Sequence, residues 1–166
     1  WGPRANAQEL WQFWGGTPPV QHIYGLTEAL AMLLDDEGLE AAWARHEALA
    51  AATWAALDAW GDGGACRAQV ADPTARGRSV TAVALAGAER LRLWTEANAG
   101  LTLGIGLGAA EPADALRIAH MGHVSAHMQL GTLASIEAGM AALGLPHGPG
   151  GTAAAAAEIA RRSGAR

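Results

Sequence analysis

The sequence predicts a small α+β domain in which a few short strands are covered by helices on one face. Apolar residues recur every three or four positions over long stretches near both ends of the chain, as they do in helices that bury one side. Short β-branched and apolar runs lie between these stretches and are bounded by glycine-rich breaks. The resulting order is helix, helix, strand, helix, strand, strand, helix, helix, and one sheet with helices packed against it suits this order.

The individual elements follow from caps, breakers and periodicity. Residues 1–16 are expected to be irregular. Helices are expected over 18–34 after an N-cap at Thr17, over 39–60, over 88–99, over 126–143 after an N-cap at Ser125, and over 152–162. Strands are expected at 79–85, 101–103 and 115–119, whereas the polar stretch 67–78 is typical of a loop.

The composition limits the classes of function. The chain has 166 residues, of which 51% are hydrophobic and 16% charged, so it can form one domain with a hydrophobic core. A net charge of −5 argues against a nucleic-acid surface, and no apolar run approaches membrane-spanning length. Cys66 is the only cysteine, which favours a reducing cytoplasm over a disulfide framework.

All 11 basic residues are arginines, so the chain contains no lysine. It also begins at Trp1 without an initiator methionine or a targeting pattern. The simplest interpretation of this start is that it lies within a longer protein.

Four motifs resemble the small domain of class V aminotransferases, especially those that handle alanine, serine and glyoxylate. They are TPPVQHIYGLTEALAMLLDDEGLEAAWARH (17–46), SVTAV (79–83), GIGLG (104–108) and LRIAHMGH (116–123), in the family's order and roughly its spacing. The resemblance implies the C-terminal small domain of a fold type I transferase dependent on pyridoxal phosphate (PLP). It would occupy residues 17–166, with a short, mainly antiparallel sheet, and residues 1–16 would connect it to a missing N-terminal large domain.

Arg117 is the first candidate site residue. The resemblance implies that it binds the substrate carboxylate, because a guanidinium offers two parallel charge-assisted hydrogen bonds and stays charged. An outward-facing strand arginine is the alternative. The family's glycine two positions later is Ala119 here, a departure that concerns local crowding rather than this role.

Thr17 and Trp14 are the candidate cofactor-binding residues. The resemblance implies that the Thr17 hydroxyl donates to the PLP phosphate bound in the neighbouring subunit of a homodimer, where a helix start also favours an anion. A plain N-cap is the alternative, and both roles are compatible. Trp14 stands where many relatives have a phosphate-binding tyrosine, and its indole has a different reach, so packing near the site is its alternative role.

The resemblance further implies an enzyme that moves an amino group from a small amino acid, alanine or serine, to a 2-oxo acid, glyoxylate or pyruvate. Such catalysis requires a lysine amine that forms a Schiff base with the cofactor. Arginine does not replace it, because a guanidinium is effectively never deprotonated. Since the chain has no lysine, it is expected to be inactive alone, and no catalytic residue is assigned within it. It is either part of a longer enzyme whose large domain is missing or a degenerate relative of the family.

Other patterns allow competing hypotheses. A non-catalytic interaction domain would use an exposed patch of Trp1, Trp11, Phe13 and Trp14. The G-x-G pattern within 104–108 is a weak nucleotide signal, and a tight, closely packed connection near the site is favoured. A metal site at His120, His123 and His127 is disfavoured because no carboxylate lies nearby in the sequence, and the tryptophan face of the 39–60 helix indicates core or interface.

Overall fold

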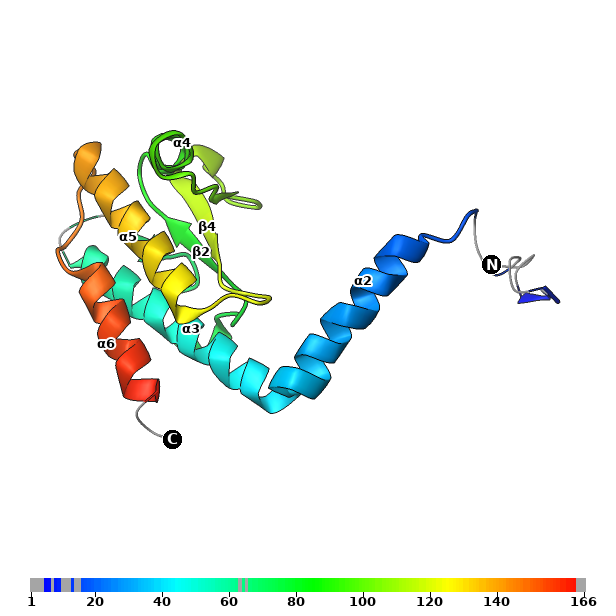
Figure 1. Cartoon of the computed structure of the whole chain (residues 1–166). Helices are drawn as coiled ribbons and strands as arrows, with labels where there is room; N and C mark the ends of the chain where they lie inside the picture. Colours follow the sequence, from blue (N-terminus) through cyan, green and yellow to red (C-terminus); the bar gives the residue numbers. More distant parts are fainter. Residues whose placement is uncertain are drawn as a thin grey trace. The chain divides into compact units, whose positions relative to one another are not determined.

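The computed structural model describes residues 5–6, 8–9, 13, 16–62, 64 and 66–163, and it divides into two compact units (Figure 1). The first unit is Trp1–Ala42 and the second is Trp43–Arg166. Helix α2 belongs to the first unit, and helix α3 (Leu39–Gly61) begins there and continues into the second. The sheet and the later helices all belong to the second unit.

Helix α2 (Val20–Ala31) starts later than the sequence predicts. Its N-cap is Pro19, and no side chain caps it, so the prediction that Thr17 caps this helix is wrong. A proline disfavours the helical conformation in the residue before it, and this keeps Pro18 out of the helix. The N–H of Val20 instead donates to the carbonyl of Pro18 at 2.9 Å.

The predicted apolar face of α2 is exposed. None of its residues is buried, and Tyr24 is 73% exposed. The helix continues as a π-helical segment, η2 (Met32–Glu37), and ends at Gly38, whose φ of +84° suits glycine. The periodicity therefore predicts the helix correctly, but within the described residues its apolar side chains have no core to join.

The sheet is antiparallel throughout and has the order β1-β2-β4-β3 among the described residues. Its strands are β1 (Arg67–Ala68), β2 (Val80–Ala84), β3 (Gly104–Ile105) and β4 (Ala115–Ala119). The central strands β2 and β4 confirm the predicted segments 79–85 and 115–119. The prediction of a strand at 101–103 is wrong, because Leu103 packs into the core and the next two residues pair with β4 instead. The short strand β1 is not predicted.

Helices cover one face of the sheet, as the sequence predicts. The later helices are α4 (Ala88–Ala99), α5 (Ala126–Ala142) and α6 (Gly151–Ser163). The bounds of α4 match the prediction, and Ser125 caps α5 as expected, accepting from the N–H of Met128 at 3.4 Å. No helix within the described ranges is long and apolar enough to cross a membrane.

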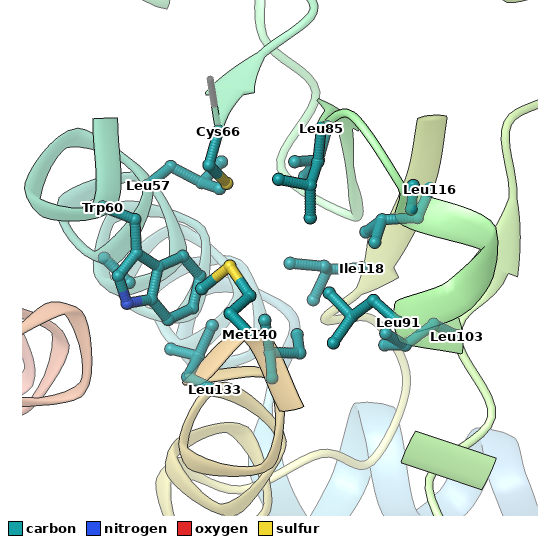
Figure 2. Packing of buried hydrophobic residues seen from close by; sticks show 14 of the residues in the cluster. Leu57, Trp60, Cys66, Leu85, Leu91, Leu103, Leu116, Ile118, Leu133 and Met140 are labelled. Carbon is teal, nitrogen blue, oxygen red and sulfur yellow. The ribbon is translucent and has the colours of Figure 1, made fainter. Parts of the chain in front are cut away.

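The core lies between this face and the helices, where side chains from α3, α4, α5 and β4 point toward one another (Figure 2). Trp60 of α3, Leu91 of α4, Leu133 of α5 and Ile118 of β4 are each no more than 1% exposed. Cys66 also lies in this core, and burial raises the pKa of its thiol to about 12, so the thiol stays protonated and inert.

A carboxylate of α5 holds the start of α6. One oxygen of Glu137 accepts from the N–H of Gly150 at 3.1 Å, and the other accepts from the N–H of Thr152 at 2.9 Å and from the Thr152 hydroxyl. Burial opposes ionisation of this carboxyl, but the hydrogen bonds outweigh burial and lower its pKa. Glu137 thus supplies from another helix the cap that α6 lacks in its own sequence.

Replacing Glu137 by glutamine is expected to lower the free energy of unfolding by about 1–2 kcal/mol at neutral pH, because a neutral amide accepts these bonds more weakly. Since the pKa of Glu137 is lowered, its contribution is fully present above the ordinary value of 4.5 and is lost as the pH falls through the folded-state pKa. Denaturant unfolding across this range should show the difference between wild type and variant narrowing below pH 4.5. Glu96→Gln, at an exposed position of α4, is the control, and a pH-independent difference for Glu137→Gln would contradict this role.

Candidate functional site

Arg117 lies in the middle of β4, on the face of the sheet opposite the helices. Its neighbours across the ladder are Ala82 on β2 and Gly104 on β3. The adjacent residues Leu116 and Ile118 point into the core and are each 1% exposed. Because side chains alternate along a strand, burial of these two residues directs Arg117 to the open face.

The Arg117 side chain is anchored at one nitrogen only. Its Nε–H donates to the carbonyl of Ile105 at 2.8 Å. In the part of the chain that the structure describes, its two Nη atoms make no hydrogen bond and no carboxylate pairs with them. The side chain is half-buried. A fixed guanidinium with two free N–H-bearing nitrogens is suited to bind a carboxylate.

A cavity of about 270 Å³ borders Arg117. Among the described residues that line it, Arg117 is the only charged one, and the lining also includes Leu101, Met121 and the two hydroxyl residues Thr102 and Thr132. One cation beside mainly apolar walls favours a small monocarboxylate over a ligand with several charges.

Two glycines of the GIGLG segment, Gly104 and Gly106, make the close packing that the sequence predicts, whereas Gly108 serves the backbone conformation. A Cβ at Gly106 would lie 2.4 Å from the Cβ of Ala115, so this glycine lets β3 approach β4. Gly108 has a φ of +74°, which glycine adopts without strain. No helix opens directly after Gly108, because a 3-10 turn, η4 (Pro112–Asp114), and β4 follow. The nucleotide-binding hypothesis therefore has no structural support.

His120 is a core histidine. It is fully buried, and its Nδ1 and Nε2 lie 3.1 Å from the Arg78 carbonyl and 2.9 Å from the Thr81 hydroxyl. The indole N–H of Trp54 donates to the same hydroxyl at 3.0 Å. Burial lowers the pKa of His120, so the neutral ring is favoured, with Nδ1–H donating to the carbonyl and Nε2 accepting from Thr81.

The three histidines do not form a cluster. His123 and His127 are exposed, whereas both ring nitrogens of His120 have protein partners. Among the described residues, no group of three or more His, Cys, Asp or Glu side chains is arranged to hold a metal ion.

Helix α3 also fixes the loop that follows β4, which the sequence does not predict. Arg45 donates from Nη1 to the carbonyls of Gly122 at 2.7 Å and Val124 at 3.0 Å. The His46 Nε2 lies 3.2 Å from the same Gly122 carbonyl. These contacts hold the loop containing Met121, which lines the cavity beside Arg117.

Thr17 is exposed, and its hydroxyl makes no hydrogen bond to the described residues. It belongs to the first unit, whereas Arg117 belongs to the second. Trp14 lies outside the residues that the structure describes, as do Trp1 and Trp11 of the hypothetical interaction patch. Phe13 is 56% exposed. Of the tryptophans of α3, Trp60 is buried, Trp54 is partly buried and Trp43 is 59% exposed.

Comparisons with known proteins agree on one family. The model of the aminotransferase class-V family matches residues 4–133. The chain is 34% identical over 149 residues to a serine–glyoxylate aminotransferase of Methylorubrum extorquens, covering 89% of this chain and 36% of that protein. It is 33% identical over 165 residues to the serine–glyoxylate aminotransferase of Arabidopsis thaliana, covering 94% of this chain and 38% of that protein.

The solved structures give the same picture. The pyridoxamine–pyruvate aminotransferase of Mesorhizobium loti superposes with a TM-score of 0.78 at 28% identity, over 89% of this chain and 38% of that one. The chain thus spans little more than a third of the length of the curated relatives and of the solved structure that it matches. A segment of this size with a small antiparallel sheet agrees with a small domain.

Proposed function

Because this chain belongs to the class-V aminotransferases, we propose that it forms the small-domain portion of an enzyme that transfers an amino group from alanine or serine to glyoxylate or pyruvate. The relatives' names support glyoxylate or pyruvate as the acceptor and serine as a donor. The observation that carries the proposal is Arg117, a half-buried cation on the open face of the sheet. Within the described part of the chain, its Nη groups are free and the cavity beside it has no other charged lining residue.

In this proposal, Arg117 binds the carboxylate next to the reacting carbon. The amino donor and the 2-oxo acceptor each carry such a carboxylate. Two hydrogen bonds from one planar group fix both the position and the plane of a carboxylate. The substrate's Cα is one bond from that carboxylate, so holding the carboxylate also orients the Cα–H and Cα–N bonds. The single positive charge beside mainly apolar lining residues favours monocarboxylates, in agreement with alanine and serine.

The family implies pyridoxal phosphate as the cofactor. The cofactor supplies an electron sink for chemistry at the substrate's Cα. Thr17 fits a phosphate contact, because its hydroxyl is exposed and has no hydrogen bond to the described residues. We assign it as a donor to the phosphate bound in the neighbouring subunit of a homodimer, and Trp14 as a further residue at this site.

The amine that attaches to the cofactor must come from residues other than these 166, because the chain has no lysine. We therefore propose that residues 17–166 act as the small domain, that residues 1–16 connect it to a large domain, and that the large domain carries the lysine. Turnover by the complete protein with alanine, serine or aspartate as donor, and glyoxylate or pyruvate as acceptor, tests the assignment. Aspartate as the preferred donor would contradict the monocarboxylate preference.

The 166-residue chain alone is expected to bind no cofactor covalently and to have no transaminase activity. After incubation with pyridoxal phosphate and dialysis, its spectrum should contain no visible absorbance band. Incubation with alanine and glyoxylate should yield no pyruvate. A retained band together with turnover would contradict the proposal that the chain is catalytically incomplete.

A further inference from the structure

We propose that Gly104 and the Ile105 carbonyl position Arg117, so that the substrate carboxylate meets the edge of the guanidinium formed by Nη1 and Nη2. This inference rests on the proposed function of Arg117 as the carboxylate-binding residue. It adds two groups of β3 that position the Arg117 side chain, and it states which edge of the guanidinium the carboxylate meets.

The first observation is the space that Gly104 leaves. Gly104 is directly opposite Arg117 in the antiparallel pair of β3 and β4. A Cβ at this position would lie 3.1 Å from the Arg117 Cβ and 3.3 Å from its Nε. Both distances are shorter than ordinary carbon contacts of 3.5–4.0 Å. Any larger residue at 104 would therefore displace the Arg117 stem by a few tenths of an ångström.

Close packing is the reason for glycine at 104, because its backbone does not require it. Gly104 does not have a positive φ, whereas Gly100 and Gly108 on either side of it do. Ala82 on the opposite neighbouring strand is also small. The Arg117 side chain is thus flanked by the two smallest residue types and can lie across β3 toward the Ile105 carbonyl.

The second observation is the hydrogen bond from Nε. A guanidinium can make paired hydrogen bonds through its Nη1–Nη2 edge or through its Nε–Nη edge. In this structure the Nε–H already donates to the Ile105 carbonyl at 2.8 Å. Only the Nη1–Nη2 edge remains for a paired contact. The hydrogen bond from Nε–H to the Ile105 carbonyl also restrains rotation of the Arg117 side chain, so the free Nη1–Nη2 edge keeps one orientation.

Gly104→Ala in the complete enzyme tests this arrangement. The KM for alanine should rise about tenfold with a smaller change in kcat, because a small displacement weakens a contact present in both ground and transition states. The inhibition constant of propionate, a carboxylate without an amino group, should rise by the same factor. A primary amine without a carboxylate should react as it does with the wild type.

Gly131→Ala is the matched control. Gly131 lies in α5, and a Cβ there would have no neighbour within 4 Å, so this variant should leave all these constants unchanged. A double-mutant cycle with Arg117→Lys then asks whether Gly104 acts through Arg117. In the Arg117→Lys background, Gly104→Ala should change the KM less than about twofold.

The outcomes separate this inference from the proposed function. If Arg117→Lys leaves kcat/KM for alanine unchanged, the proposed carboxylate-binding role of Arg117 fails and the inference falls with it. If Arg117→Lys raises the KM while Gly104→Ala behaves like Gly131→Ala, only the inference is overturned. The inference is also overturned if Gly104→Ala changes the KM for alanine equally in the wild-type and Arg117→Lys backgrounds. An equal effect of Gly104→Ala on the amine lacking a carboxylate overturns it as well.

Arginine side-chain ¹⁵N spectra of the wild-type enzyme provide a test that does not depend on folding of the Gly104→Ala variant. The signals of Arg117 are assigned by their loss in Arg117→Lys. Titration with propionate should shift the Nη–H signals and leave the Nε–H signal in place and protected from exchange. A shift centred on Nε–H would mean that the carboxylate replaces the Ile105 carbonyl, which contradicts the inference.

Discussion

Arg117→Lys in the complete enzyme is expected to lower kcat/KM for alanine or serine by roughly 30- to 1000-fold, equivalent to about 2–4 kcal/mol of transition-state stabilisation. Lysine keeps the positive charge but lacks the planar pair of donors. It also lacks the Nε–H that the Ile105 carbonyl accepts in the wild type. Steady-state kinetics with each amino acid and glyoxylate measure the loss.

Two comparisons make this result specific to the carboxylate. A primary amine without a carboxylate should lose far less rate than alanine, since it never contacts Arg117. Cofactor affinity should stay close to the wild-type value, because Arg117 is not assigned to the phosphate or the ring. Unchanged kcat/KM for alanine would mean that Arg117 only decorates the open face of the sheet.

Trp60→Ala is expected to lower the free energy of unfolding of the 166-residue chain by about 3–5 kcal/mol, because it removes a large side chain from a closed core. Trp60 is 0% exposed and lies beside Leu133 and Met140 of α5 (Figure 2). The start of α6 also packs on it, since a Cβ at Gly151 would lie 2.1 Å from the Trp60 Nε1. The neighbouring helices are therefore poorly able to fill the cavity. Denaturant unfolding followed by circular dichroism measures the change.

Trp43→Ala is the matched control, because the same residue type occurs in the same helix with a different environment. Trp43 is 59% exposed, so its truncation should change the free energy of unfolding by no more than about 0.5 kcal/mol. If Trp60→Ala and Trp43→Ala lower the free energy of unfolding by similar amounts, burial of the side chain is not the cause of the loss.

The sequence predicts most of the helices because their ends carry local signals. Helix α4 is bounded by two glycines with positive φ, and Ser125 caps α5 through its own side chain. The start of α2 is predicted wrongly because two successive prolines change the local geometry, and the proline effect on Pro18 overrides the capping ability of Thr17. Local chemistry thus predicts a helix end well where one signal acts alone.

The candidate site is predictable in part. The resemblance of LRIAHMGH to the family singles out Arg117, and alternation along β4 places it on the face opposite Leu116 and Ile118. The proposed role of Gly104 is not predictable without the register, because glycine has a low strand propensity and the sequence favours a strand at 101–103 instead. The signal that finds it is the antiparallel pairing, which sets Gly104 opposite Arg117.

The short outer strands of the sheet affect how copies of this chain meet at high concentration. β-Sheets grow between molecules when a long, flat edge strand leaves rows of N–H and C=O groups for another chain to pair with. Here the order β1-β2-β4-β3 places the two-residue strands outside and the five-residue strands inside. Each edge offers few backbone groups, and Arg67 adds a charge to one of them. Crowded copies should therefore associate through the exposed apolar side chains of α2, giving reversible helical contacts rather than the fibrils that intermolecular strand addition produces.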